Sequence, residues 1–196
     1  GRNTLMENTS GCYSTAIGQQ ALTASVATGD TGNTAVGGSA MLSNTTGTNN
    51  TALGRCALVC NTTAVNNTAV GKDALKLSTT ATQNTAIGML SLDAATSGSY
   101  NSGLGYASLS VLTTGAFNVG AGYIAGNGIT TGSYNVAIGS HSLATTTTAS
   151  NNTAVGSCAL NKNTSGQQNT AVGVNTMQCN TTGQYNSAFG FQAMNR

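Results

Sequence analysis

The chain has 196 residues, of which only 5% are charged, and it contains neither Pro nor Trp. A soluble domain usually carries about a quarter of its residues as charges, and a net charge of +2 offers no basic patch to neutralise nucleic-acid phosphates. No apolar run approaches the roughly 18 residues of a membrane span, and one His with four acidic residues leaves few groups for acid–base catalysis. Composition predicts a protein that is no enzyme, needs no cofactor, and neither binds nucleic acid nor inserts into a membrane.

A 17-residue repeat runs through the whole chain. Its marker is a Gly that recurs at intervals of 17, with one interval of 19, at Gly1, Gly18, Gly37, Gly54, Gly71, Gly88, Gly105, Gly122, Gly139, Gly156, Gly173 and Gly190. With this Gly as coil position 1, the consensus reads G-x-x-A-L-x-x-N-T-T-G-x-N-N-T-A-V. The 19-residue unit carries two extra residues within Ser25–Gly32, which predicts a surface bulge on one coil.

This period predicts a solenoid of stacked β-coils. Repeats built from helix pairs exceed about 30 residues, so 17 residues favour short strands. The Asn-Thr-Ala-Val segment before each Gly predicts one strand, and the Ala-Leu and Asn-Thr-Thr segments predict further short extended pieces. Gly and Asn mark the corners, because both tolerate positive φ. Coils stacked about 4.8 Å apart make residues 1–196 a single all-β module, a parallel β-solenoid of eleven repeat intervals and roughly 50 Å length.

Two apolar columns are predicted to form the core. Position 17 holds Ile17, Val36, Leu53, Val70, Ile87, Leu104, Ala121, Ile138, Val155, Val172 and Phe189. Position 5 holds Leu5, Leu22, Met41, Leu58, Leu75, Leu92, Leu109, Gly126, Leu143, Leu160, Met177 and Met194. Burying a large apolar side chain contributes about 1.5–3 kcal/mol, against about 1–2 kcal/mol of backbone entropy for every ordered residue. Two such side chains per coil are few, so we expect a further buried face from association of identical subunits.

Polar columns accompany the apolar ones. Position 14 is Asn in ten successive units, at Asn33, Asn50, Asn67, Asn84, Asn101, Asn118, Asn135, Asn152, Asn169 and Asn186. Stacked Asn side chains form amide ladders along the stacking direction, and we prefer this structural interpretation to ten separate ligand contacts because the column follows the fold period. The Thr column at position 9, which includes Thr9, Thr62 and Thr147, is interpreted in the same way.

The units "NTAVGKDAL", "NTAVGSCALNKNTSG" and "NVAIGSHSL" carry a resemblance that covers essentially the whole chain. They resemble the head repeats of trimeric autotransporter adhesins and, more closely, the 17-residue repeat arrays of phage tail fibres and bacterial surface proteins. The resemblance implies a left-handed parallel β-roll that assembles as a homotrimer. It implies an extracellular fibre shaft or adhesin module, one piece of a longer fibre, with a cell-surface glycan or protein as its receptor.

Aromatic residues recur on neighbouring coils around the most irregular part of the repeat, Gly103–Gly128. Tyr100, Phe117 and Tyr134 share position 13, and Tyr106 and Tyr123 share position 2. Such ladders usually serve packing or contact with a neighbouring subunit. An exposed aromatic strip can also hold a ligand such as a sugar ring, so these five residues are the candidate ligand-binding site.

The cysteines and the histidine give weaker signals. Five cysteines, Cys12, Cys56, Cys60, Cys158 and Cys179, leave disulfide pairing open, because the separation of their Cα atoms cannot be deduced from sequence. His141 and Cys158 share position 3 on adjacent coils, but a structural zinc needs four ligands. We therefore predict no metal site.

Three alternatives stay open. Asn-x-Thr at positions 8 and 10 of many coils, such as Asn44/Thr46 and Asn61/Thr63, resembles the flat faces of ice-binding solenoids if both positions face solvent. A polysaccharide depolymerase would need two acids in one groove, and Asp73 and Asp93 occupy different coil positions. A disordered Thr/Asn-rich spacer is opposed by the apolar columns that keep in phase.

Overall fold

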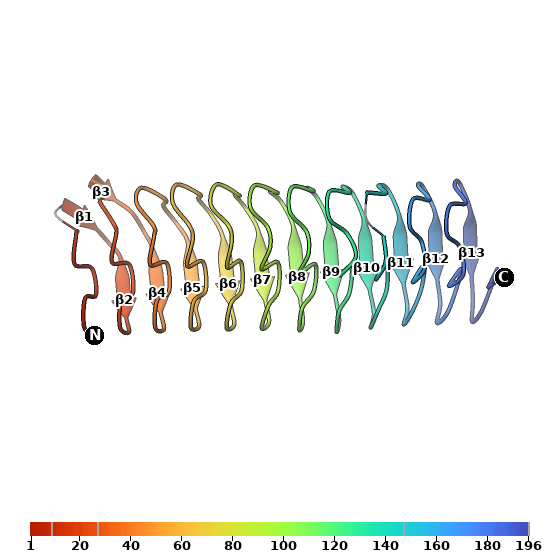
Figure 1. Ribbon diagram of the computed structural model, residues 1–196, viewed down its shortest axis with the longest axis horizontal. Coiled ribbons are helices and arrows are strands. Elements are labelled where there is room, and N and C mark those ends of the chain that lie inside the picture. The colour runs from red at the N-terminus through yellow and green to blue at the C-terminus, as the bar shows by residue number, and fades with distance from the viewer. Residues whose placement is uncertain (9, 27, 147, 196) are drawn as a thin grey trace.

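The structure, a computed structural model, describes residues 1–8, 10–26, 28–146 and 148–195, and within these ranges it contains three-residue strands and no helix. The strands are β1 (Ser10–Cys12), β2 (Thr15–Ile17), β3 (Thr28–Asp30), β4 (Thr34–Val36), β5 (Thr51–Leu53), β6 (Thr68–Val70), β7 (Thr85–Ile87), β8 (Ser102–Leu104), β9 (Val119–Ala121), β10 (Val136–Ile138), β11 (Thr153–Val155), β12 (Thr170–Val172) and β13 (Ser187–Phe189). The coils that carry them stack into an elongated rod (Figure 1).

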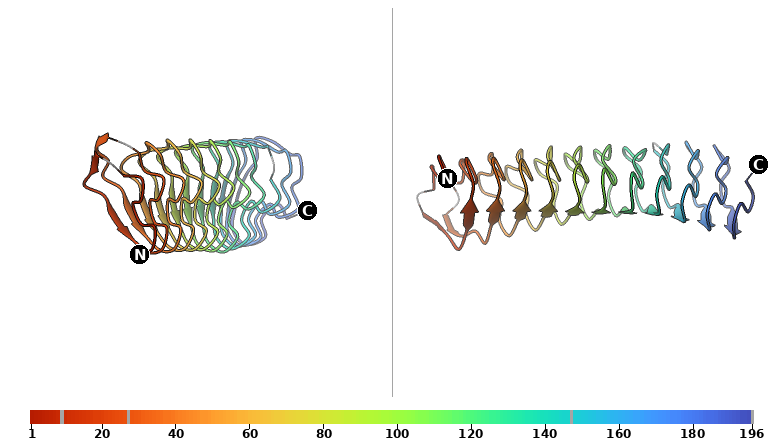
Figure 2. Two further views of the ribbon diagram at one scale, coloured as in Figure 1. Left: turned by 60° about the vertical axis from the view of Figure 1, so that its left-hand side comes forward. Right: turned by 90° about the horizontal axis from the view of Figure 1, so that it is seen from below.

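Eleven of these strands form one parallel sheet along the rod, in the order in which they occur in the chain, from β2 and β4 to β13. Val70 pairs with Ile87, and Ile87 pairs with Leu104, so neighbouring strands are offset by one repeat. Two further views show the same succession of coils side by side along the axis (Figure 2). The predicted parallel β-solenoid is confirmed.

The two extra residues of the second unit lie where the rod is locally widened. Ile17 in β2 pairs with Val36 in β4, an offset of 19 residues. Between these strands, β3 pairs with β1 in a separate two-stranded parallel sheet, which projects at the N-terminal end of the rod (Figure 1). All three residues of β3 are exposed, as expected for a surface bulge. Ala27, within the predicted segment, lies outside the described residues.

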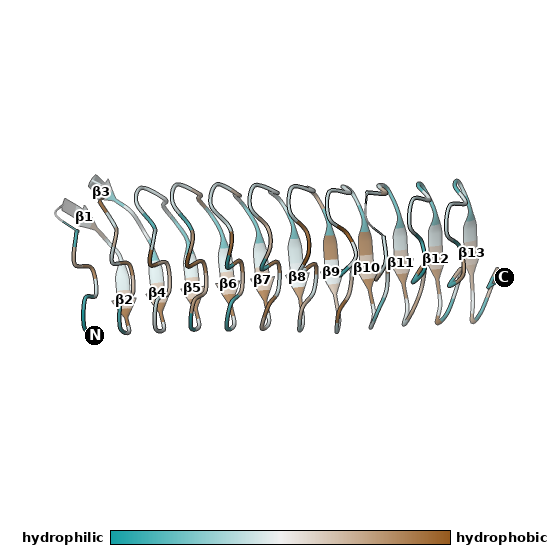
Figure 3. Cartoon of the chain, in the orientation of Figure 1, coloured by the Kyte–Doolittle hydropathy of each residue, from teal (hydrophilic) through white to brown (hydrophobic). Residues whose placement is uncertain are grey.

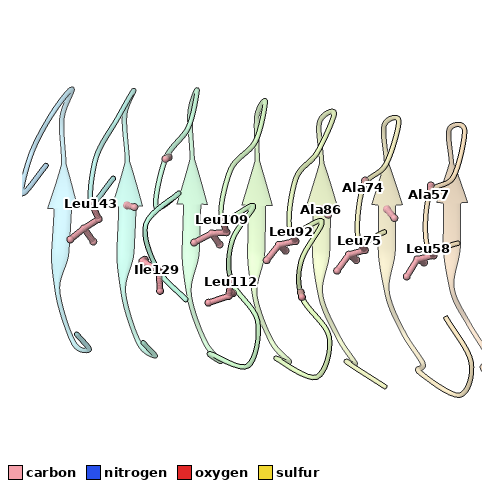
Figure 4. Packing of buried hydrophobic residues seen from close by; sticks show 14 of the residues in the cluster. Ala57, Leu58, Ala74, Leu75, Ala86, Leu92, Leu109, Leu112, Ile129 and Leu143 are labelled. Atoms are coloured by element: carbon pink, nitrogen blue, oxygen red, sulfur yellow. The ribbon is translucent and has the colours of Figure 1, made fainter. Parts of the chain in front are cut away.

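The core lies on one side of each strand, and one predicted core column is wrong. The position 5 side chains of Leu22, Leu58 and Leu75 are fully buried, and Figure 4 shows this column continuing from coil to coil. Position 17 faces outward instead: Leu53 is 47% exposed and Leu104 is 43% exposed. Alternate residues of a strand point to opposite faces, and the position 16 alanines, such as Ala52, are the ones that point inward, with 0% exposure.

The Ala-Leu segment is a turn and not the extended piece that we predicted. Leu58 at position 5 has φ of 51° and Cys56 at position 3 has φ of 58°, and the same left-handed conformation recurs at these positions along the rod. A left-handed residue other than Gly costs roughly 1–2 kcal/mol, while burial of a Leu side chain returns about 1.5–3 kcal/mol. In the regular coils the described Asn-Thr-Thr segments likewise contain no strand, so each of these coils has one strand.

The Asn column at position 14 forms a continuous ladder through the rod, as predicted. The side-chain Oδ1 of Asn50 accepts a hydrogen bond from the backbone N–H of Asn67 at 2.9 Å. The Nδ2 of Asn50 donates to the carbonyl of Ala64 at 2.8 Å. Both contacts recur from Asn33 to Asn169, and the column is fully buried over most of its length. The Asn amides therefore satisfy backbone groups at the corner that precedes each strand.

Hydroxyl groups at position 9 also connect neighbouring coils. The Oγ1 of Thr62 donates to the carbonyl of Thr79 at 3.1 Å, and that of Thr79 donates to the carbonyl of Thr96 at 3.2 Å. The structural interpretation of this column is thus confirmed where it is described. Thr9 and Thr147, which belong to the same column, lie outside the described residues.

In the irregular part of the repeat, Gly103–Gly128, the core stays filled because a large side chain at one coil position compensates for a small one at another. Gly126 replaces the usual Leu at position 5, and a Cβ on Gly126 would lie 2.6 Å from Cδ2 of Leu109 and 3.3 Å from Cδ1 of Ile129. Leu112 and Ile129 are fully buried at position 8, where other coils have Asn, Ser, Thr or Ala. Bulk lost at position 5 is therefore supplied from position 8.

A second exchange links positions 4 and 16 within one coil. In two of the three coils with Ser at position 4, at Ser91 and Ser108, position 16 becomes Gly103 and Gly120. In the third coil Ser142 faces Ala154, and its hydroxyl donates to the carbonyl of Gly139 at 2.9 Å. A Cβ on Gly103 would overlap the Ser91 hydroxyl, and one on Gly120 would lie 2.5 Å from the Ser108 hydroxyl. The Ser hydroxyl thus occupies the volume of the Ala methyl group that faces it in other coils.

This exchange predicts a strong coupling between two substitutions. Gly103→Ala is expected to destabilise the rod by about 1–3 kcal/mol through overpacking. Ser91→Ala removes a buried hydroxyl that has no hydrogen-bond partner and should be close to neutral. The double variant restores the Ala/Ala pair of Ala74 and Ala86 and should unfold near the wild-type midpoint. Denaturant unfolding of all four proteins measures the coupling energy, and additive effects of the two substitutions would contradict this packing.

Candidate interaction surface

Three of the candidate ligand-binding residues form one stacked ladder on the surface. The ring centroids of Tyr100 and Phe117 lie 4.8 Å apart and those of Phe117 and Tyr134 lie 5.0 Å apart, with 4° between ring planes in both pairs. Their side chains are 49%, 45% and 58% exposed, in the same order. The structure therefore brings together the position 13 aromatics that the repeat spacing had aligned.

These aromatic residues occupy a backbone conformation that suits them poorly. Tyr100, Phe117 and Tyr134 have φ of 62°, 59° and 59°, and other coils place Asn66 and Asn151 at the same position and conformation. Asn tolerates the left-handed region well, whereas a bulky side chain there is an outlier. Gln83 and Tyr185 have the same conformation at position 13, so the repeat imposes it, and the three aromatic residues accept a conformational cost that Asn avoids.

The stacking determines which parts of the rings are accessible. Phe117 lies between Tyr100 and Tyr134, so both of its faces are covered and its edge points outward. A sugar ring packs on an aromatic face, and the ladder offers free faces at most at its two ends. The geometry consequently favours contact between ring edges and a neighbouring surface over a row of sugar sites.

The two remaining candidates form a second stack at the corner after the strand. Tyr106 and Tyr123 have ring centroids 5.4 Å apart with 13° between planes, and they are 42% and 51% exposed. His141 continues the column, with its ring tilted by 57° against Tyr123 at 5.5 Å. Binding of a ligand by these five aromatics stays a prediction.

The strand face between the two stacks is apolar in the same coils. Val119 and Val136 replace Thr at position 15 and make β9 and β10 the most apolar strands of the sheet in Figure 3. Leu104 and Ile138 at position 17 are 43% and 40% exposed. We call this surface the aromatic patch: Tyr100, Leu104, Tyr106, Phe117, Val119, Ala121, Tyr123, Tyr134, Val136 and Ile138. Its aliphatic part was missed from the sequence, because position 17 had been predicted inside the core.

The aromatic patch lies in a long uncharged stretch of the chain. Residues 94–161 contain no Asp, Glu, Lys or Arg. An uncharged apolar surface binds by burial of area and by shape, because no charge is present to attract a polar or ionic ligand.

Asp73 and Asp93, the two acids considered for a depolymerase groove, differ in their surroundings. Asp73 is buried, and its carboxylate lies 2.9 Å from Nζ of Lys72 and 3.9 Å from Nζ of Lys76. Burial raises the pKa of the Asp93 carboxyl, and the negative charge of Asp73 adds to this effect, while backbone hydrogen bonds and Lys76 oppose it. Asp73 is thus engaged in ion pairs, and the two carboxyl groups interact although their coil positions differ.

In the described coils, positions 8 and 10 do not form the pair of exposed columns that the ice-binding alternative requires. Asn44 and Asn61 at position 8 are fully buried, and only position 10, with Thr46 and Thr63, faces solvent. The amide of Asn61 donates to Oδ1 of Asn44 and to the carbonyl of Ala64. Position 8 is therefore an internal column, with amide contacts between Asn44 and Asn61 and between Asn163 and Asn180. The flat surface that motivated the ice-binding alternative is absent from the described coils.

The cysteines and His141 have the following surroundings. All five cysteines are free, with Cys12 and Cys179 exposed and the others half-buried. The Nδ1 of His141 forms a hydrogen bond with the hydroxyl of Ser140 at 2.9 Å. Across the described part of the chain, no three His, Cys, Asp or Glu side chains gather in a geometry that holds a metal ion.

The described residues also include no helix long and apolar enough to cross a membrane. A scan against protein-family models, a search of curated proteins and a search of solved structures each gave no match.

Proposed function

We propose that this chain is a non-enzymatic structural module of an extracellular fibre. It serves as a shaft or receptor-binding segment of a phage tail fibre or bacterial surface adhesin, and three copies associate side by side. The single observation that carries this proposal is an exposed apolar column along an uninterrupted eleven-stranded sheet. Such a face is stable in water when another surface covers it.

The backbone supports the role of a stiff spacer. Each regular coil donates and accepts hydrogen bonds with the coils before and after it, at the strand, at the Gly corner and in the turn segment, as with Gly71 to Leu53, Leu75 to Ser91 and Thr79 to Thr96. The chain contains no proline that would interrupt this pattern, and its charged residues are few. A rod of this kind spaces or presents a binding element at a fixed distance.

The regular surface supports an assembly of identical subunits. Position 17 presents one aliphatic side chain per coil, and coils are about 4.8 Å apart. A partner surface with the same spacing of side chains interlocks with this column. A second copy of the chain has that spacing because it has the same coils. Three copies around one axis would cover the column on every copy.

Mass measurement tests the assembly. The chain mass is 19.4 kDa, and we expect native mass spectrometry and light scattering to give three times this value. The combined substitution of Ile87, Leu104 and Ile138 by Thr should produce monomers that keep the far-ultraviolet circular dichroism of the wild type, because these side chains face outward.

A matched control uses apolar residues of similar exposure away from the strand face. Leu77 is 44% exposed and Val111 is 38% exposed, both at position 7. Their replacement by Thr should leave the trimer intact. A monomeric wild-type protein would refute the proposed assembly. So would the opposite pattern, in which the control variant dissociates and the strand-face variant stays trimeric.

A further inference from the structure

The exposed column at position 17 leaves one property of an assembly undetermined, namely the axial register of its subunits. Nearly every coil presents Val, Ile or Leu there, for example Leu53, Val70 and Ile87. A neighbouring copy that slides by one coil, about 4.8 Å, meets almost the same surface. Strand arrays with uniform faces are prone to such slippage.

The aromatic patch breaks this uniformity. Position 15 is apolar only at Val119 and Val136, while the other strands of the large sheet have Thr or Ser there. Position 2 carries Tyr106 and Tyr123 in the patch, whereas the charged Lys72 and Arg55 occupy it two and three coils before Tyr106. Sliding one subunit along another moves aromatic and aliphatic side chains of the patch onto these polar positions.

We propose that the aromatic patch sets the register of neighbouring copies, with patch against patch and the rods parallel and level. This inference rests on the proposed assembly of identical subunits. The patch selects one axial register, which the uniform position 17 column cannot do. The strained aromatics at position 13 fit this role, since Asn at the same position would be easier to accommodate but would not distinguish one coil from the next.

A second copy fits the patch better than other occupants. Residues 94–161 provide no charge for an ionic ligand, and the covered faces of Phe117 exclude a row of stacked sugars. The patch's five rings are 42–58% exposed, and an aromatic ring buries roughly 150–250 Å², so covering them removes on the order of 500 Å² from water. In the proposed assembly, the position 17 column along all eleven strands supplies the association, and the patch adds its area at one register.

Distances between spin labels on different subunits test the register. Thr63 and Ser165 are exposed, share position 10 and lie six coils apart. Each is replaced singly by a labelled Cys, in a background where the five native cysteines are Ser. Level, parallel rods should give one narrow intersubunit distance, and the same distance for both labels.

The decisive variant makes the patch resemble an ordinary coil. It takes residues that the coils around Asn151–Ser157 have at the same positions: Tyr100→Asn, Phe117→Asn, Tyr134→Asn, Val119→Thr, Val136→Thr, Tyr106→Ser and Tyr123→Ser. We expect an assembly of unchanged mass whose distance distribution broadens and gains longer distances. The matched control, Tyr13→Asn with Tyr185→Asn, removes position 13 aromatics outside the patch and should retain the narrow wild-type distance.

The possible results separate this inference from the proposed function. An oligomer whose wild-type labels give several distances, or unequal distances at Thr63 and Ser165, overturns the register and leaves the assembly intact. A patch variant that keeps the single wild-type distance also overturns it. A variant that becomes monomeric overturns it too, because the patch would then supply association and not register. A monomeric wild type refutes both proposals.

Discussion

Replacing one repeat glycine by alanine should destabilise the rod severely. Gly37 has φ of 134°, a conformation that side chains rarely adopt. A Cβ there would lie 2.6 Å from both the carbonyl carbon and oxygen of Gly54 on the next coil. Because the obstacle is backbone, the coils must separate locally. We expect Gly37→Ala to lower the free energy of unfolding by about 3–5 kcal/mol, measured by denaturant unfolding at fixed protein concentration.

The neighbouring residue provides the control. A Cβ added to Gly38 would have no atom of another residue within 4 Å beyond its chain neighbours, and Gly38 does not have positive φ. Gly38→Ala should therefore change stability by no more than about 0.5 kcal/mol. Similar effects for the two substitutions would show that the Gly corners are not in close contact between coils.

Removing one amide from the Asn ladder should have the second large effect. The Nδ2 of Asn101 donates to the carbonyl of Gly115 at 2.9 Å, and its Oδ1 accepts from the backbone N–H of Asn118 at 2.9 Å. Asn101→Ala leaves both backbone groups buried without this partner. Each unsatisfied group costs about 1–3 kcal/mol, so we expect a loss of about 3 kcal/mol in the same unfolding measurement.

An exposed amide serves for comparison. Gln167 at position 12 faces solvent, and Gln167→Ala should alter stability by less than about 0.5 kcal/mol. A loss below about 1 kcal/mol for Asn101→Ala would mean that water replaces the amide and that the ladder contributes little to stability.

The stacking of coils was predictable because it depends only on the period. Residues 17 apart must be neighbours once each unit closes a coil, and this alone aligned the position 14 amides, the position 5 leucines and the aromatic ladder. The internal Asn pairs at position 8 were not recognised, because Ser, Ala, Leu, Ile and Thr interrupt that column and Asn is common on surfaces as well.

The side to which position 17 points could not be deduced from its apolar character. A Val or Leu column indicates burial, but the burying surface can be the same chain or another one. The coil is narrow, so the strand turns its small residue, such as Ala69, inward and leaves Val70 outside. Likewise, nothing in the propensity of Leu predicts the left-handed conformation of Leu75, which results from the need to bring a large side chain to the centre of a tight turn.

A series of intramolecular distances tests the stacked-coil geometry most directly. Spin labels at Thr63 are paired with a label at Thr114, Thr131 or Ser165, all at position 10, and the labelled protein is diluted into excess unlabelled protein. These residues are three, four and six coils away, so the distances should rise in even steps of about 4.8 Å per coil, to roughly 14, 19 and 29 Å. Distances that do not increase in proportion to the number of repeats would contradict the solenoid and every conclusion drawn from its columns.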